Sequence, residues 1–195
     1  YGVICFSLFG ISYYRLGEYN YPLVILSTTI IGTVIGFLYY NLSDRSKKIF
    51  MGDTGSMLLG FLLTFTSICF MDIFIVKKVQ GAVFYHLNTA PVMAIAIMIL
   101  PIIDTLNVII IRLAEKRSPF DADKNHIHHK LLKLGITHKR ATLYIISYYL
   151  FIVIISYFLR HVEVNLLLII ILLLGFLGAY LPDFFYKKKN VTFSL

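Results

Sequence analysis

Five apolar runs, each close to the length of a membrane-spanning helix, dominate this chain of 195 residues. The runs cover roughly 22–40, 55–76, 89–111, 141–160 and 164–182. A helix needs about 20 predominantly apolar residues to cross the hydrocarbon core of a bilayer. A sixth apolar run, residues 1–14, is too short to span alone. The sequence therefore predicts an all-α fold: a polytopic transmembrane helical bundle with about five to six spans.

The composition agrees with a membrane protein and argues against a soluble nucleic-acid binder. Hydrophobic residues make up 58% of the chain and charged residues 14%, whereas a soluble domain is about half apolar and a quarter charged. The formal net charge is +8, but the basic residues are not interleaved with aromatic residues on one soluble face. They lie between the apolar runs, where they set membrane topology and meet anionic lipid or substrate. We expect membrane partners and no nucleic acid.

The distribution of lysine and arginine predicts the orientation of the spans. Fourteen of the 18 basic residues lie in the gaps 41–54, 112–140 and 183–195, which alternation of the spans puts on one side. Positively charged loops stay on the cytoplasmic side of a membrane. The two polar segments of the chain, 49–56 and 118–129, are thus expected to meet at the cytoplasmic face.

The first polar segment contains Gly52, Asp53, Thr54 and Gly55 at the start of an apolar run. One interpretation is an N-cap, because Asp or Thr before a helix satisfies its first free amides. The other is a phosphate site, since glycines allow close backbone approach and a helix N-terminus favours anions. A carboxylate there also suits Mg²⁺, which binds through one or two carboxylates and substrate phosphates. Spacing alone favours the cap.

Asp104 lies inside an apolar run, about two turns before Arg112. Carboxylates at such positions are costly and usually face a polar cavity or a partner. Asn107 follows three residues later, on the same helical face. A polar seam and a packing pair hydrogen-bonded to a neighbouring helix explain these two residues equally well.

The longest polar stretch, 112–140, contains three histidines within four residues: His126, His128 and His129. If a helix follows Pro119, Asp123 shares a face with His126 and His129, and His128 points elsewhere. Zinc is one ligand for such a cluster, although its spacing does not ensure the required geometry. Alternatively, the imidazoles grip a pyrophosphate or nucleotide together with Arg112, Arg117 and Lys124, or the loop is only solvated and basic.

Two strings of residues resemble the polyprenyl-phosphate N-acetylhexosamine-1-phosphate transferases. The first is Lys48-Ile49-Phe50-Met51-Gly52-Asp53-Thr54-Gly55-Ser56 followed by Leu59-Gly60. The second runs from Pro101-Ile102-Ile103-Asp104-Thr105-Leu106 through Arg112 to Ser118-Pro119-Phe120, Asp123, Lys124 and His126-Ile127-His128-His129. The resemblance covers roughly 23–150. The histidine block is closer to enzymes that begin O-antigen (lipopolysaccharide), enterobacterial common antigen or wall teichoic acid synthesis than to phospho-N-acetylmuramoyl-pentapeptide transferase. The alternative outside the family is a transporter segment.

The resemblance implies a reaction and residue roles. In this family undecaprenyl phosphate attacks the β-phosphorus of a UDP-N-acetylhexosamine at the cytoplasmic face of the bacterial inner membrane, and UMP leaves. The resemblance gives Asp53 the role of ligand to Mg²⁺, for which Mn²⁺ substitutes, and gives Asp104 an orienting catalytic role. It assigns substrate binding to His126, His128, His129, Arg112, Arg117, Asn41, Gly52 and Gly55. Whether the enzyme forms a homodimer is left open by the resemblance.

The resemblance also predicts how much of the enzyme this chain represents. The paired aspartates of the family lie in its N-terminal half, and residues 1–40 do not supply them. Residues 1–195 are therefore expected to be the C-terminal part of a single multi-span membrane domain. We expect this part to be inactive by itself.

Overall fold

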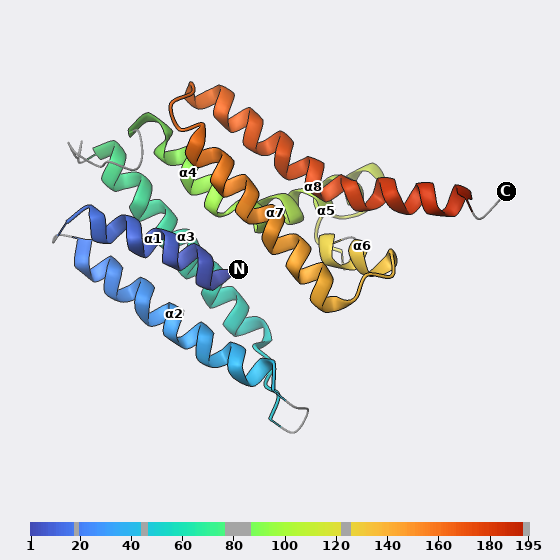
Figure 1. Cartoon of the computed structure of the whole chain (residues 1–195), viewed down its shortest axis with the longest axis horizontal. Coiled ribbons are helices and arrows are strands. Elements are labelled where there is room, and N and C mark those ends of the chain that lie inside the picture. Colours follow the sequence, from blue (N-terminus) through green and yellow to red (C-terminus); the bar gives the residue numbers. More distant parts are fainter. Residues whose placement is uncertain (18–19, 44–46, 77–86, 122–125, 193–195) are drawn as a thin grey trace. The chain divides into compact units, whose positions relative to one another are not determined.

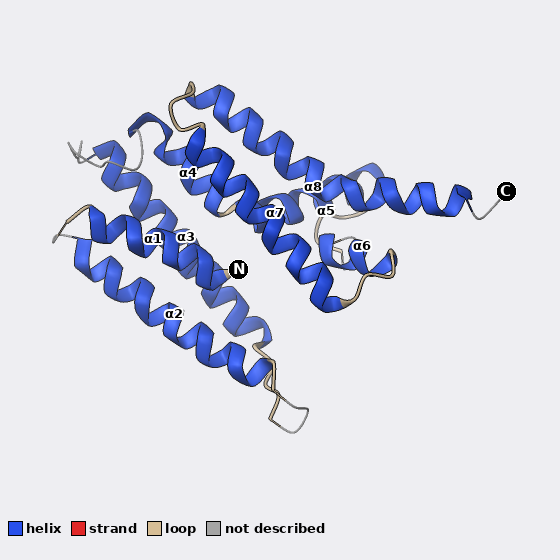
Figure 2. Ribbon diagram, viewed as in Figure 1, coloured by secondary structure: helices blue, strands red, loops and turns tan. Residues whose placement is uncertain are grey.

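The structure is a computed structural model that describes residues 1–17, 20–43, 47–76, 87–121 and 126–192. In these ranges every regular element is a helix (Figure 2), as predicted. The helices are α1 (Gly2–Arg15), α2 (Tyr21–Asn41), α3 (Gly52–Val76), α4 (Ala90–Ile97) after a 3₁₀ turn (Leu87–Thr89), α5 (Ile99–Ala114), α6 (Ile127–Lys133), α7 (His138–Phe158) and α8 (Val164–Thr192). They form two compact units, Tyr1–Ile97 and Met98–Leu195.

Four of the described helices are long and apolar enough to cross a membrane. They are Tyr21–Asn41, Gly52–Ile73, His138–Phe158 and Val164–Phe185, and α4 with α5 makes a fifth span if the two count as one bent span. The chain is a polytopic helical membrane protein. With the bent pair counted as one span, the described helices give five spans, the lower end of the predicted five to six. Helix α1 does not add a sixth, because it has only 14 residues.

The predicted span 89–111 is not one continuous helix. It is interrupted at Met98, between α4 and α5. Pro101 has no backbone N–H, so it cannot donate to the carbonyl of Ile97 as an uninterrupted α-helix requires. The Ile97 carbonyl instead accepts hydrogen bonds from the Tyr1 hydroxyl at 2.9 Å and the Cys5 thiol at 3.4 Å.

In the first unit α1 packs against both α2 and α3 (Figure 1). Phe9, Tyr13 and Phe70 form its aromatic core, with the Phe9 and Phe70 rings 5.6 Å apart. The Tyr13 hydroxyl also donates to the carbonyl of Thr66. Helix α2 buries only Ser27 and Ile30 and leaves its other apolar side chains exposed or half-buried, which suits a helix that faces lipid.

In the second unit α8 packs along α5 and α7, and the short helix α6 contacts α7 and α8 (Figure 1). The core contains Ile103, Tyr149, Leu167 and Ile171. Gly175 permits close approach of α5, because a Cβ there would lie 2.6 Å from Cγ1 of Ile103. Within this unit, α6 and the C-terminal part of α8 lie together, joined by the Lys130–Asp183 ion pair.

Candidate active site

Asp104 of α5 joins the histidine segment to the second unit. One carboxylate oxygen accepts a hydrogen bond from the backbone N–H of Ile127 at 2.8 Å, and the other lies 2.9 Å from Nδ1 of His126. The Asp104 side chain is partly buried, with 26% of its surface exposed. Asp104 therefore bonds to a short helix outside the spans, which favours the polar-site interpretation over simple packing between spanning helices.

The local sequence explains why α6 takes this bond. His126 occupies the N-cap position with extended backbone, and its own side chain makes no capping hydrogen bond. The first amides of a helix lack intrahelical acceptors, and a carboxylate near them is stabilised by the helix dipole. Asp104 supplies that carboxylate from another helix. Because a carboxylate only accepts, Nδ1 of His126 carries the proton in this contact, and Nε2 is left for other partners.

The three histidines form one continuous row of rings. The ring centroids of His126 and His128 are 6.2 Å apart, and those of His128 and His129 are 4.0 Å apart. The prediction that His128 points away from the other two is therefore wrong. That prediction assumed a helix running through 123–129, whereas α6 begins only at Ile127. Asp123 and Lys124 lie outside the described residues.

Burial lowers the pKa of His128 below its ordinary value, and the adjacent His129 lowers it further. Asp104 opposes these effects, while His126 and His138 act in the same direction as His129. The row is thus arranged to keep at least His128 neutral near pH 7. Neutral imidazoles accept or donate one hydrogen bond per nitrogen and move protons readily.

Lys130 is a site residue that the sequence analysis did not select. Its ammonium group is buried on α6 and lies 2.5 Å from a carboxylate oxygen of Asp183 on α8. An aspartate directly after Pro182 at the end of an apolar run was the available signal. The pair could not be read from spacing, because 53 residues separate its members.

Arg112 and Arg117 stabilise the loop after α5. The Arg112 guanidinium donates to the carbonyl of Pro119, and Arg117 pairs with Glu115 at 2.8 Å and with Asp121 at 3.8 Å. Helix α5 ends in a Schellman turn, with the Arg117 N–H bonded to the Arg112 carbonyl at 2.8 Å. Their predicted contact with a nucleotide stays a prediction.

Asp53, Gly52, Gly55 and Asn41 belong to the first unit. Asp53 is exposed in the first turn of α3 and lies inside the helix, so the N-cap interpretation is wrong. Gly52 has φ of +69°, a conformation that favours glycine. A Cβ at Gly55 would lie 2.6 Å from Cγ of Met51. Asn41 donates to the carbonyl of Ile49 at 3.0 Å and ties the end of α2 to the segment before α3.

The chemistry of Asp53 fits the predicted magnesium ion. Among the described residues its carboxylate makes no hydrogen bond or ion pair, so both oxygens are available. Within the same residues no group of three or more His, Cys, Asp or Glu side chains is arranged to hold a metal ion. A single carboxylate with substrate phosphates suits Mg²⁺, which retains several waters, and does not suit a zinc centre.

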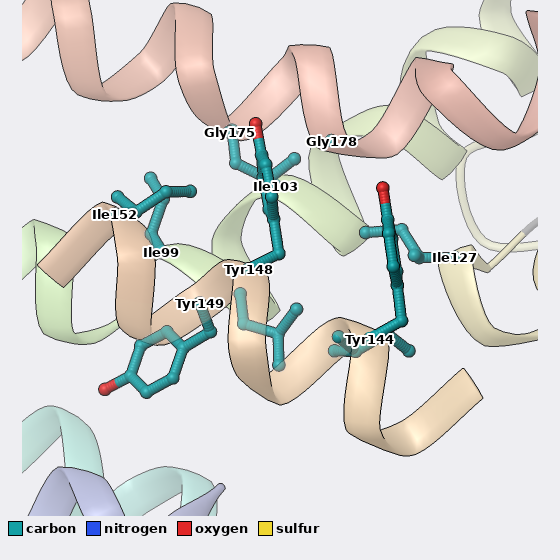
Figure 3. Close-up of a pocket in the computed structure, with 11 residues that line it drawn as sticks. Ile99, Ile103, Ile127, Tyr144, Tyr148, Tyr149, Ile152, Gly175 and Gly178 are labelled. Atoms are coloured by element: carbon teal, nitrogen blue, oxygen red, sulfur yellow. The ribbon is translucent and has the colours of Figure 1, made fainter. Parts of the chain in front are cut away.

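An apolar hollow adjoins the Asp104 contact in the second unit (Figure 3). Its volume is about 370 Å³ including the space open to the surroundings. Ile103 and Ile127, the neighbours of Asp104 and His126 in sequence, line it together with Tyr144 and Tyr148. Figure 3 shows these two tyrosines extending from α7 in the same direction, and their rings are 6.3 Å apart. The Tyr148 hydroxyl donates to the carbonyl of Leu174 at 2.7 Å.

Comparison with known proteins gives a consistent family. Residues 1–71 match the model of glycosyl transferase family 4. The decaprenyl-phosphate N-acetylglucosaminephosphotransferase of Mycolicibacterium smegmatis is 36% identical over 70% of this chain and 32% of its own length. The undecaprenyl-phosphate alpha-N-acetylglucosaminyl 1-phosphate transferase of Escherichia coli is 30% identical over 72% of this chain and 36% of its own length.

A third relative is the probable undecaprenyl-phosphate N-acetylglucosaminyl 1-phosphate transferase of Bacillus subtilis, which is 35% identical over 62% of this chain and 30% of its own length. The chain thus spans about a third of the length of the curated relatives that it matches. No solved structure matches the chain.

Proposed function

Since the chain belongs to glycosyl transferase family 4, we propose that it forms part of a membrane enzyme that transfers N-acetylhexosamine-1-phosphate to undecaprenyl phosphate. The proposed donor is a UDP-sugar, in the first place UDP-GlcNAc. The relatives in Mycolicibacterium smegmatis and Escherichia coli bear names that specify a polyprenyl phosphate and N-acetylglucosamine. Those names favour this donor over the muramoyl-pentapeptide alternative.

The proposed reaction is an exchange of phosphoanhydride bonds. An oxygen of the lipid phosphate attacks the β-phosphorus of the nucleotide sugar, the bond from that phosphorus to the bridging oxygen breaks, and UMP leaves. Phosphoryl transfer of this kind depends on positioning and on neutralising charge at the phosphate oxygens. We propose the cytoplasmic face of a bacterial inner membrane as its location, because 14 of 18 basic residues lie in the gaps assigned to that side.

The observation that best supports a role in phosphoryl transfer is the bond of Asp104 to His126. It holds the imidazole with Nδ1 toward the carboxylate, so that Nε2 is left for the substrate: it donates to a phosphate oxygen when it carries a proton and receives a proton when it does not. His128 and His129 extend the same row of rings. In a solvated basic loop there is no reason for an aspartate of a spanning helix to fix the first histidine.

We assign Asp53 to hold Mg²⁺ in the complete enzyme. Such an ion would supply neutralisation of the negative charge on the pyrophosphate of the donor, and Asp53 would be one of the residues that hold it. Asp53 is suited to this role by its exposed carboxylate in the first turn of α3. Gly52 keeps the backbone beside it free of a side chain. The apolar hollow lined by Ile103 and Ile127 offers a surface for prenyl carbon close to the histidines.

The test is UMP release by the full-length enzyme in lipid with magnesium. Asp53→Asn should abolish release while the protein still inserts, and Asp72→Asn, an exposed aspartate of the same helix, is the matched control. A transporter segment predicts solute flux that survives Asp53→Asn. A purely structural module predicts that Asp53→Asn and His128→Ala leave function unchanged. Residues 1–195 alone should show no turnover, and robust turnover would contradict that expectation.

A further inference from the structure

The short helix α6 is held in place by contacts from two different spanning helices. It has seven residues, too few for a helix that is stable in isolation. Asp104 of α5 binds its first amide, and Lys130 connects its middle to α8. The position of the histidines on α6 therefore depends on these tertiary contacts.

The contacts of Lys130 use its ammonium group fully. Besides the oxygen of Asp183 at 2.5 Å, the Nζ atom lies 3.5 Å from the carbonyl oxygen of Ala179 and 5.7 Å from the centre of the Tyr180 ring. Lys130 as a whole is 4% exposed, whereas the Asp183 side chain is 42% exposed. A lysine is almost never this deeply buried unless it is paired.

Net stability does not account well for such a pair. Removing a lysine from water is costly, and apolar residues of similar volume often stabilise a protein equally well or better. What an ion pair adds is a defined position, because the charge is satisfied in only one arrangement. Here that arrangement connects directly to the site, since the backbone N–H of Lys130 bonds to the carbonyl of His126 at 3.1 Å.

We propose that Lys130 and Asp183 are a positioning pair for the histidine row. By fixing α6 against α8, the pair keeps Nδ1 of His126 on the Asp104 carboxylate and leaves Nε2 directed toward the reacting phosphates. The effect on catalysis rests on the proposed function, whereas the effect on His126 does not. Neither residue is proposed to touch the substrate.

The variant that tests the pair is Lys130→Met in the full-length protein, which keeps an apolar stem and removes the charge. We expect nitrogen NMR of labelled histidines to show loss of the Nδ1–H tautomer at His126. We also expect kcat to fall about 10-fold or more, as is usual when an outer partner of a functional histidine is lost, with a smaller change in KM for the nucleotide sugar. Lys133→Met is the matched control, because Lys133 is an exposed lysine of the same helix. It should leave the tautomer unchanged.

Two further variants separate position from stability. Lys130→Arg keeps the charge and should recover most of the Nδ1–H signal. The double variant Lys130→Met with Asp183→Leu removes both charges and should regain thermal stability without regaining that signal. The inference would be overturned if the double variant recovered both thermal stability and the Nδ1–H signal of His126, or if Lys130→Met left that signal unchanged. If transferase activity is absent from the unmodified protein as well, the proposed function fails and the NMR result still decides the role of the pair.

Discussion

The carboxylate of Asp104 accepts the backbone N–H of Ile127 at 2.8 Å, so a residue of α5 caps the N-terminus of α6. The same side chain contacts Nδ1 of His126 with its other oxygen at 2.9 Å. One carboxylate thus controls both where the short helix begins and how the first imidazole is oriented. These two effects can be separated by substitution.

Asp104→Asn should retain the cap of α6 and change the hydrogen-bonding role of Nδ1 in His126. To keep the bond from Ile127, the amide must direct its NH₂ group at His126, which forces Nδ1 to act as an acceptor. Asp104→Ala removes both bonds and leaves a buried N–H unpartnered, at a cost of about 1–3 kcal/mol. We therefore expect the Ala variant to lose more stability in thermal unfolding, and both variants to lose the Nδ1–H tautomer of His126 by NMR. Thr105→Ala, at the exposed neighbouring position, is the control. Equal stability of the Asn and Ala variants would contradict this account.

The spans could be predicted from the sequence because the bilayer imposes their length and apolar character. Helices α2, α3, α7 and α8 agree with the predicted runs to within a few residues at most ends. The interruption at Met98 could not be predicted in the same way. Proline is tolerated inside membrane helices when another group satisfies the freed carbonyl, and here that group is the hydroxyl of Tyr1, 96 residues away.

The site could be predicted only as a set of residue types. Asp104 and the histidines were selected because acidic and imidazole groups are rare in an apolar chain, and the structure brings Asp104 to His126. The predicted orientation of His128 was wrong because it depended on the residue at which α6 begins. That residue is determined by the contact with Asp104, which lies in another helix. Lys130 was missed for the same reason, since its partner Asp183 lies on another helix.

The lowered pKa of His128 predicts how stability changes with pH. Burial and then His129 hold this pKa below the ordinary 6.5, so the unfolded chain binds more protons just below that value. Stability should therefore fall as the pH decreases from about 6.5 to the lowered folded-state pKa, and then level off. His129→Ala should raise the pKa of His128 toward 6.5 in an NMR titration, and His161→Ala should not. If His129→Ala leaves the pKa of His128 unchanged, His129 is not a cause of the lowered pKa.

Gly178 should be intolerant of even a methyl group. A Cβ at this position of α8 would overlap Cε1 of Tyr148, so Gly178→Ala must displace the ring that lines the apolar hollow. Overpacking of this kind costs about 1–3 kcal/mol, measurable by thermal unfolding in detergent. Gly60→Ala is the matched control, because nothing lies within 4 Å of a Cβ there. A similar effect of both substitutions would show that helix propensity and not the Tyr148 contact is responsible.

Glu163 should make the N-terminus of α8 sensitive to acid. Backbone N–H groups of Asn165 and Leu166 lower the pKa of this carboxyl below its ordinary value of 4.5, and one oxygen accepts the Leu166 N–H at 2.9 Å. A carboxylate at the start of a helix is also favoured by the helix dipole. Because the folded-state pKa is the lower one, the stabilising effect is complete above 4.5 and disappears as the pH falls through the folded value.

Hydrogen exchange of the Leu166 amide is the direct measurement of this cap. Protection should decrease at acidic pH in the unmodified protein. Glu163→Gln keeps an oxygen acceptor without a titrating charge, so its protection should be weaker at neutral pH and should no longer depend on this ionisation. Glu115→Gln is the control, since Glu115 lies at the C-terminus of α5 and pairs only locally with Arg117. If Glu163→Gln retains the full pH dependence, another group is responsible for the acid response of α8.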